Sequence, residues 1–292
     1  MRVKYPEETR ELVEAGLERY FPAGKRPDIL YEAMTHSLFS GGKRFRGILV
    51  IETAKAFGVS PKKALPTACA VEFIHTYSLI HDDLPAIDND YLRRGQPTCH
   101  VLFGEDIAIL AGDALFAEAF NLIAREQAAD DPAGVLKVVA EIAGATGVCG
   151  MVGGQAVDVV SSGKQVDAET LEYIHHNKTG ALIRASTVSG AILGGADEKS
   201  LRSITEYGVS LGLAFQVTDD ILDVIGDPGL LGKTPGSDER AKKATYPGIC
   251  GLERAQEFAR ERVEAAKASL SNLDSRTSVL RDLADFVFER QW

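Results

Sequence analysis

The sequence predicts an all-α protein with one domain, residues 1–292, in which more than ten helices surround a deep central cavity. Apolar residues recur at steps of three and four over most of the chain, as they do on the buried face of a helix. Strand signals are nearly absent, since no run alternates apolar and polar residues for long and no Asn-Gly hairpin occurs. No repeat of about 20–50 residues and no Pro/Ser-rich linker interrupts the pattern, which favours a single domain.

The first half of the chain divides into helices at recognisable start and stop residues. Pro22 closes the first helix, and Asp28 is a suitable N-cap for the second. Gly58 ends the third helix, and the pair Ser60-Pro61 is a common start for the fourth. The expected helices are residues 3–20, 28–37, 46–57, 61 to the acidic stretch near residue 82, and 105–126.

The second half is also predicted to be helical, with one glycine-rich segment at residues 132–160. Glycine is unfavourable in an exposed helix, and its small size instead permits the close approach of a second helix or of a ligand. Asp167 starts the helix that follows. The expected helices are residues 132–160, 167–179, 181–193, 201–225, 252–273 and 278–290.

The composition is that of a soluble globular protein, with 45% hydrophobic and 25% charged residues. A net charge of −10 disfavours nucleic acid and anionic membranes as partners. We find neither a signal sequence nor a stretch of ~18 uncharged apolar residues, so no membrane anchor is expected. The four cysteines form no CxxC and no zinc-like spacing with histidine. We therefore expect a cytoplasmic protein.

The stretch of residues 81–100 concentrates charge at the end of an apolar helical pattern. Asp82, Asp83 and Asp88 follow that pattern closely, and Arg93 and Arg94 come next. Clustered carboxylates repel one another, and burial adds to the cost of their charge, so cations must lie among them. Oxygen ligands of this kind select Mg²⁺ or Mn²⁺, often together with substrate phosphates, and arginine donates well to phosphate oxygens.

A second acidic cluster, Asp219, Asp220 and Asp223, follows another apolar run. One DDxxD motif arises easily on an acidic helix surface, but two such clusters on apolar helices indicate two walls of one metal–diphosphate cavity. Asp219 and Asp223 lie on one side of a helix. Asp82 and Asp88 are roughly 120° apart in an ideal helix, so they can converge only if the helix breaks, which proline at residue 85 can cause.

The chain resembles the bacterial short-chain trans-isoprenyl diphosphate synthases, which include the farnesyl and geranylgeranyl diphosphate synthases. The resemblance covers nearly the whole sequence, and its motifs are specific together. They are GGKRFRG (41–47), EFIHTYSLIHDDLPAIDNDYLRRGQPTCH (72–100), GDALF (112–116), HNKTGALI (176–183), FQVTDDILDV (215–224), GK (232–233) and KATYPG (243–248).

The resemblance implies the isoprenoid synthase fold, a homodimer, and head-to-tail prenyl transfer. An allylic diphosphate ionises with the help of Mg²⁺ (about three ions with substrate bound, with Mn²⁺ as a substitute). The double bond of isopentenyl diphosphate then attacks the cation. By resemblance, Asp82, Asp88 and Asp219 are the principal metal ligands. The residues that assist them are Asp83, Asp220 and Asp223.

The same resemblance divides the basic residues between two substrates. Isopentenyl diphosphate is expected to bind, without metal, to Lys43, Arg46, His75 and Arg94. The allylic diphosphate is expected to contact Arg93, Lys178, Lys233 and Lys243, with Thr179 and Gln216 near the reacting carbons. His81 and His100 are interpreted as structural. No side chain is an obvious general base, and the departing diphosphate itself can accept the proton.

Product length is expected to depend on the helix that carries the first cluster. One helical turn rises about 5.4 Å, close to one isoprene unit. Tyr77 lies five residues before Asp82 and can form a floor under the growing chain, whereas Ser78 leaves its side open. The length of the first motif and its preceding aromatic residue resemble the bacterial farnesyl type, so we predict a C15 product, with geranylgeranyl diphosphate (C20) as the alternative.

Three other functions are considered. A terpene cyclase would need no pocket at residues 41–46, and its second metal motif usually mixes Asn, Ser and Glu. A non-catalytic synthase subunit tends to lose one acidic cluster, and both are intact here. A metal-binding protein without enzymatic activity would not need these basic residues. Assaying diphosphate release from isopentenyl and dimethylallyl diphosphates separates all of them.

Overall fold

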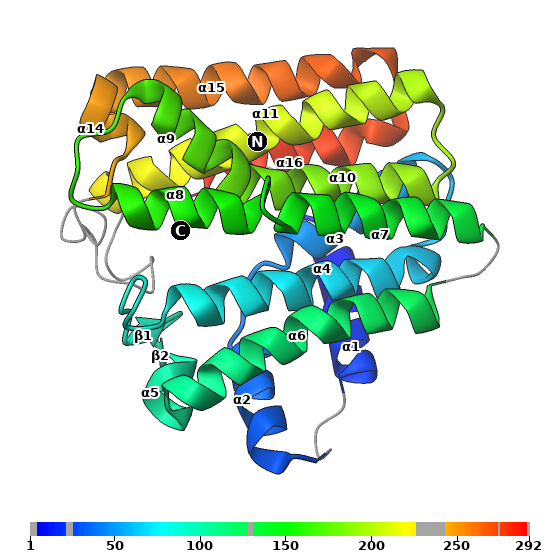
Figure 1. Cartoon of the computed structure of the whole chain (residues 1–292). Helices are drawn as coiled ribbons and strands as arrows, with labels where there is room; N and C mark the ends of the chain where they lie inside the picture. Colours follow the sequence, from blue (N-terminus) through cyan, green and yellow to red (C-terminus); the bar gives the residue numbers. More distant parts are fainter. Residues whose placement is uncertain (1–4, 22–25, 128–130, 226–242, 274, 291–292) are drawn as a thin grey trace.

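The computed structural model describes residues 5–21, 26–127, 131–225, 243–273 and 275–290 (Figure 1). The predicted all-α class is confirmed, because helices account for nearly all of the regular structure in these residues. Except for a short helix at residues 99–103, which the sequence pattern did not predict, the first helices follow the expected order. They are α1 (Glu7–Tyr20), α2 (Asp28–Leu38), α3 (Phe45–Ala56), α4 (Pro61–Asp82), α5 (Cys99–Phe103) and α6 (Glu105–Glu126).

A short β-hairpin follows α4 and, like α5, was not predicted from the sequence pattern. Strand β1 (Leu92–Arg93) pairs antiparallel with β2 (Gln96–Pro97). The two residues between them, Arg94 and Gly95, both have positive φ, at 53° and 75°. Two consecutive left-handed residues form the tight turn whose twist suits a hairpin, and an arginine in that position is an uncommon signal for it.

The glycine-rich segment forms two helices, so the expected single helix at residues 132–160 is wrong. Helix α7 (Pro132–Thr146) ends before Gly147, and α8 (Met151–Ser161) begins after Gly150. The N–H of Gly150 donates to the carbonyl oxygen of Gly147 at 3.0 Å, closing a tight turn. A Cβ atom on Gly150 would lie 2.1 Å from the carbonyl oxygen of Ala145. The turn therefore requires glycine at this position.

The remaining helices complete the bundle. Helix α9 (Ala168–Ile174) continues through a π-helical segment, η1 (His175–Gly180), into α10 (Ala181–Leu193). Helix α11 begins earlier than expected, and the last turn of α15 tightens into a 3₁₀ segment. The elements after α10 are α11 (Glu198–Ile225), α14 (Tyr246–Cys250), α15 (Leu252–Ser269), η2 (Leu270–Asn272), η3 (Ser275–Thr277) and α16 (Ser278–Glu289).

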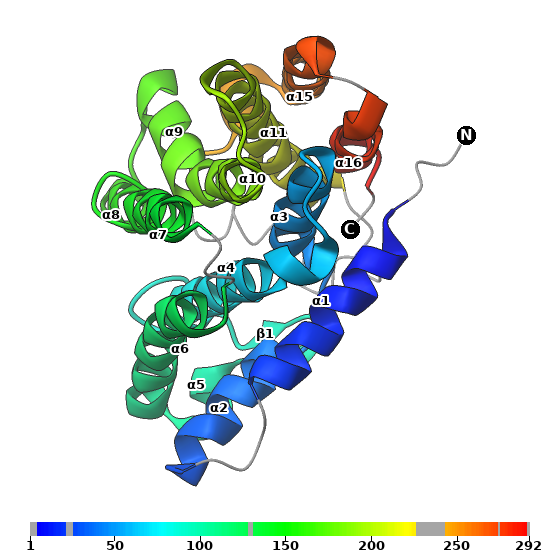
Figure 2. The ribbon, with the colours of Figure 1, turned by 90° about the vertical axis from the view of Figure 1, so that its right-hand side faces the viewer.

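Helices α4, α10 and α11 are at the centre of the packing. Helix α10 contacts α3, α7 and α11, while α4 packs between α3 and α6. Figure 2 shows α10 surrounded by α3, α7, α9 and α11, with α4 and α6 crossing below them. Helices α15 and α16 cover the outer side of α11. This arrangement leaves the ends of α4 and α11 that carry the two acidic clusters near each other.

Two segments, Glu105–Glu126 and Pro132–Ser161, are long and apolar enough to cross a membrane by length and composition alone. Only 39% and 33% of the respective apolar stretches is buried inside the chain. The second segment is interrupted by the turn at Gly147 and Gly150, so it is not one continuous helix. Both segments thus present apolar side chains on the outside of this chain.

Candidate active site

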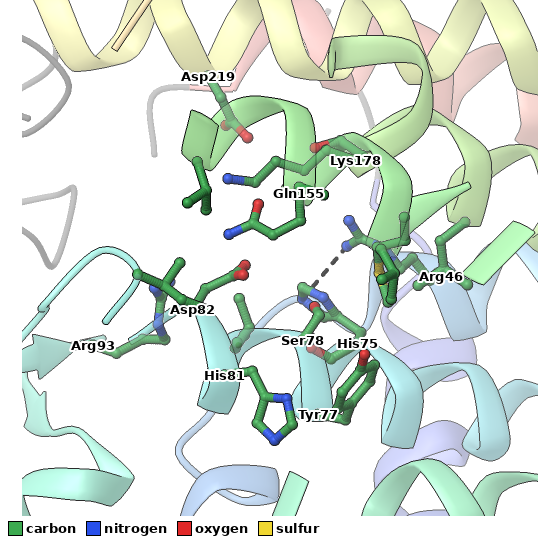
Figure 3. A pocket seen from close by; sticks show the side chains of 18 of the residues that line it. Arg46, His75, Tyr77, Ser78, His81, Asp82, Arg93, Gln155, Lys178 and Asp219 are labelled. Carbon is green, nitrogen blue, oxygen red and sulfur yellow. Dashed lines mark hydrogen bonds between the residues drawn. The ribbon is translucent and has the colours of Figure 1, made fainter. Parts of the chain in front are cut away.

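A cavity of about 700 Å³ lies between α4, α8, η1 and α11. Asp82 and Asp219 lie on facing walls, and Lys178 projects between them (Figure 3). Much of the remaining wall is apolar and comes from α8 and from Leu182 of α10. A cavity with opposed charged groups and an apolar side suits a molecule that has an anionic head and a hydrocarbon tail.

The chain turns back directly after α4, and this turn holds the two outer aspartates of the first cluster together. The N–H of Asp88 donates to the carbonyl oxygen of Asp82 at 2.9 Å. Pro85 lies within the turn, so the helix break that convergence required is confirmed. Burial raises the pKa of Asp82 to about 6, and the nearby Lys178 opposes that rise. A cation in the cavity would favour the charged carboxylate further.

The hairpin delivers two arginines to different partners. The Arg93 guanidinium donates to Asp83 Oδ1 through Nη2 at 2.5 Å and through Nε at 2.8 Å. Asp83 is buried and does not line the large cavity. Its role in this structure is therefore to hold Arg93. Arg94 lines the cavity and donates to the carbonyl oxygen of Gly41, which ties the hairpin to the loop before α3.

The second cluster, on α11, divides between two sides of its helix. Asp219 faces the cavity, where Arg290 Nη2 lies 2.8 Å from Asp219 Oδ1. Asp220 instead accepts from the N–H of Tyr246 at 2.9 Å and from Gln216 Nε2 at 3.0 Å. Asp223 is buried on the same helix and does not line the large cavity. Asp219 is thus the member of this cluster that the structure places opposite Asp82.

The π-helical segment η1 places Lys178 and Thr179 at the cavity wall. Lys178 Nζ donates to Asp158 Oδ2 at 2.6 Å, and the Thr179 hydroxyl donates to Gln216 Oε1 at 2.6 Å. A π-helical segment inside a longer α-helix is rare and often marks a functional site. Here it turns two adjacent polar side chains toward the same space.

A smaller cavity of about 70 Å³ adjoins the first and shares Lys178 with it. Lys243 lies there, with Nζ 2.9 Å from Asp88 Oδ1 and 4.0 Å from Asp158 Oδ2. Lys243 therefore connects the first acidic cluster to α8. Lys233, the remaining basic residue expected on the allylic side, lies outside the described residues.

Three of the four residues expected to bind isopentenyl diphosphate line one end of the large cavity, namely Arg46, His75 and Arg94. Burial lowers the pKa of His75 well below its usual value, and Arg46 lowers it further. The ring is thus neutral, so His75 Nε2 accepts from Arg46 Nη1 at 3.4 Å. Lys43, the fourth residue, does not line the cavity itself; its Nζ lies over the Phe286 ring at 5.0 Å.

The neighbouring Arg44, in contrast, points away from the cavity. It has a left-handed backbone and donates through Nε to Glu14 Oε1 at 2.8 Å and through Nη2 to the carbonyl oxygen of Leu38 at 2.7 Å. This buried arginine fixes α1 to the loop before α3.

Three further polar residues of the site were not predicted from the sequence. Asp158 and Gln155 share α8, and Arg290 follows α16. The spacing of Gln155 and Asp158, one turn apart in an apolar helix, is a signal that could have identified them. Arg290 contacts Asp219 only through tertiary packing, because the two residues are far apart in the sequence, and no local pattern indicates such a pair.

The donors around the cavity fit divalent cations of the Mg²⁺ type in their chemistry. Asp82 and Asp219 offer oxygen atoms from two walls of the cavity, and the Asp88 carboxylate lies beside the cavity, where it pairs with Lys243. Burial raises the pKa of Asp82, and a bound cation would favour its charged form. Within the described ranges, no three acidic, His or Cys side chains lie close enough together to hold an ion. Mg²⁺ commonly takes only one or two carboxylates and completes its coordination with phosphate oxygens and water, so substrate would complete the site.

An aromatic layer lies below the first cluster. Tyr77 lines the cavity, its ring centroid 4.9 Å from that of His81 and 5.0 Å from that of Phe116. Phe116 in turn contacts Phe120 at 5.3 Å. Ser78 lines the same cavity and donates its hydroxyl to the carbonyl oxygen of His75 at 2.9 Å. The layer joins α4 to α6 beside the cavity.

The sequence profile of the polyprenyl synthetase family matches residues 27–281. The chain belongs to the polyprenyl synthetase family. It is 46% identical to the farnesyl diphosphate synthase of Geobacillus stearothermophilus over 97% of this chain and 96% of that protein. It is also 46% identical to the geranylgeranyl diphosphate synthase of Cyanophora paradoxa, covering 98% and 95% of the two chains.

Among solved structures, geranylgeranyl pyrophosphate synthetase from Pyrococcus horikoshii has a similar fold, with a TM-score of 0.88 and 33% identity over 97% of this chain and 98% of that one. The resemblance to short-chain trans-isoprenyl diphosphate synthases is thereby confirmed, and with it the activity of a prenyltransferase. Relatives of equal identity carry farnesyl and geranylgeranyl names, so family membership alone leaves both product lengths open.

Proposed function

We propose that this polyprenyl synthetase condenses isopentenyl diphosphate with dimethylallyl and geranyl diphosphates to give farnesyl diphosphate in the cytoplasm. The observation that carries the proposal is the placement of Asp82 and Asp219 on facing walls of one cavity, which Arg46, His75 and Arg94 also line. A terpene cyclase needs one diphosphate site, whereas these three basic residues would bind a second diphosphate.

The residues suggest a division of labour during the reaction. Arg93 and Lys178 bind the allylic diphosphate, and Arg46 and Arg94 orient isopentenyl diphosphate so that its double bond faces the allylic carbon. Mg²⁺ held by Asp82, Asp88 and Asp219 would neutralise charge on the departing diphosphate. The allylic C–O bond breaks with its electron pair on the diphosphate, the new C–C bond forms, and the diphosphate takes the proton that is lost.

The preference for a C15 product rests on Tyr77. Its ring is held between His81 and Phe116, so it is supported from α4 and from α6 rather than free to turn aside. A ring that is held on two sides blocks a growing hydrocarbon chain better than a ring that can rotate away. The C20 alternative is favoured by Ser78, which lines the same cavity with a small side chain.

We further propose that two copies form a homodimer through α6 and α7. Exposed apolar side chains on these helices and on the turn that follows include Ile109, Leu110, Leu136 and Val148, of which Val148 is 81% exposed. Large apolar side chains left exposed on neighbouring helices suit an interface, and two-fold dimers are the most common assembly.

The test is an assay of diphosphate release with isopentenyl and dimethylallyl diphosphates, followed by chromatography of the dephosphorylated products. We expect Mg²⁺-dependent turnover and mainly C15 alcohol. Asp82→Ala and Asp219→Ala should each lower kcat by several orders of magnitude while the fold survives, because each removes a ligand rather than core volume. Turnover close to that of the unaltered enzyme in either variant at saturating Mg²⁺ would contradict the assignment of the cavity.

A further inference from the structure

The wall that α8 contributes to the large cavity contains one polar side chain, Gln155. The other α8 residues that line the cavity are apolar, and they are Met151, Val152, Ala156, Val159 and Val160. Gln155 Oε1 and Nε2 are both buried, and neither has a hydrogen-bond partner among the described residues. A buried amide without partners is unfavourable, so stability alone would favour another apolar side chain at this position.

The amide points into the cavity at the level where the charged groups begin. Figure 3 shows it in the space between Lys178 and Asp82. Asp158, three residues further along the same helix, holds Lys178 Nζ at 2.6 Å. Because Lys178 and Asp82 belong to the end where the allylic diphosphate is proposed to bind, and the apolar wall suits the hydrocarbon chain, Gln155 lies where head and chain would join.

We propose that Gln155 is a catalytic residue that contacts the reacting allylic carbons. When the allylic C–O bond breaks, the electron pair leaves with the diphosphate and positive charge spreads over the allylic carbons. The carbonyl dipole of Gln155 stabilises that charge through Oε1, and Nε2 donates to an oxygen of the departing diphosphate. The amide forms no covalent bond and exchanges no proton. This inference rests on the proposed function and adds a residue to it.

A neutral amide suits this position better than the alternatives. A carboxylate would repel the diphosphate and could combine with the cation, and an apolar side chain would offer no dipole. Preorganised dipoles stabilise charge that develops during a reaction without having to reorient. Since the dipole interacts with the charged species more than with the intact substrate, its effect should appear in kcat rather than in substrate affinity.

The experiment compares Gln155→Met with the unaltered full chain, since methionine keeps the length of the side chain and removes the dipole. Binding is measured by calorimetry in Mg²⁺ for two probes. One is a dimethylallyl diphosphate analogue with sulfur in place of the bridging oxygen, which does not ionise. The other carries an ammonium nitrogen at the carbon that becomes cationic. Met151→Leu, which alters the shape of the same wall without removing a dipole, is the matched control.

For Gln155→Met we expect about tenfold or greater loss of affinity for the ammonium analogue, less than about threefold change for the sulfur analogue, and about a 10²-fold fall in kcat. The melting temperature should stay level or rise. Met151→Leu should change the affinities for both probes by similar factors. If Gln155→Met also weakens the binding of both probes by similar factors, or lowers the melting temperature with kcat unchanged, Gln155 is structural and the inference is overturned. An unaltered chain that releases no diphosphate would instead overturn the proposed function.

Discussion

At the scale of single residues, Arg93 and Arg94 are bound by different partners. Substituting each arginine should therefore have a different effect. Arg94→Ala should raise the KM for isopentenyl diphosphate by about 10- to 100-fold through loss of a charge-assisted contact, with a smaller change for the allylic substrate. Arg93→Ala should do the reverse and also lower the melting temperature, since Asp83 loses the guanidinium that it binds. Steady-state kinetics with each substrate varied in turn measure the two KM values. Equal changes in KM for both substrates in both variants would contradict the assignment.

Lys43 should make isopentenyl diphosphate binding depend on pH. Burial and, to a smaller extent, the nearby Arg290 lower the pKa of Lys43 to about 8, although Asp219 opposes the fall. The ammonium form that attracts diphosphate therefore predominates below pH 8 and is lost above it. We expect the KM for isopentenyl diphosphate to rise by up to about tenfold per pH unit above that value.

The matched control for this pH dependence is Lys43→Arg. A guanidinium stays charged throughout the range in which the enzyme can be assayed, so the rise in KM should disappear or move to higher pH. A rise that is unchanged in this variant would assign the titration to another group.

At the scale of elements, product length is expected to depend on the contact between α4 and α6, where Tyr77 packs against Phe116. Removal of the Tyr77 ring opens the aromatic layer toward Phe116 and Phe120. Tyr77→Ala should therefore lengthen the product from C15 to C20 or beyond, as measured by chromatography of the dephosphorylated alcohols. Ser78→Phe is the matched control, since it fills the same cavity and should give no longer product. A main product of C20 from the unaltered enzyme, or C15 from Tyr77→Ala, would exclude Tyr77 as the floor.

The contact between α8 and η1 depends on a glycine. A Cβ atom on Gly154 would lie 2.3 Å from the backbone nitrogen of Lys178, so the two elements must separate to accept it. Gly154→Ala should lower the free energy of unfolding by about 1–3 kcal/mol and reduce kcat by displacing Lys178. Urea denaturation and kinetics measure both effects.

Gly134→Ala serves as its control and should leave kcat unchanged, because the added methyl group meets the Asp131 side chain that caps α7 and Gly134 does not line the large cavity. Equal kcat values for Gly154→Ala and the unaltered chain would show that this close approach does not position Lys178.

The elements also show what local pattern could and could not predict. The break between Asp82 and Asp88 was predictable, because the spacing required it and proline allowed it. The helix at residues 132–160 was wrong because hydrophobic periodicity continues through the turn at Gly147 and Gly150. The hairpin was missed because its turn begins with an arginine, Arg94, in a left-handed conformation.

Within the site, the residues that the sequence identified are those with a motif, such as Asp82, Lys178 and Asp219. The direction in which each side chain points depends on tertiary packing, so the motifs alone could not predict it. Asp220 follows Asp219 directly, and about 100° of helical rotation turns it toward Tyr246. Arg290 reaches Asp219 from the far end of the chain, a pairing that depends on the whole bundle being assembled.

For the molecule as a whole, the proposed dimer gives a further prediction. Sedimentation should show two chains, and Leu110→Glu combined with Leu136→Glu should give monomers with a lower melting temperature, because charge would be buried without partners. Ile29→Glu, at an exposed apolar site on α2, should leave the dimer intact. A double variant that still sediments as two chains would place the interface elsewhere.

The π-helical segment η1 has a consequence for how this chain tolerates insertions and deletions. A π turn contains one residue more than an α turn, so deleting a single residue from His175–Gly180 would let α9 and α10 join as one regular helix. Such a deletion need not harm folding, because the flanking helices would keep their orientation, but it would remove the π turn that holds Lys178 and Thr179 at the cavity wall. Lys178 or Thr179 would then leave the cavity wall. A library of single-residue deletions should therefore contain, at this segment, soluble and stable chains that have lost turnover.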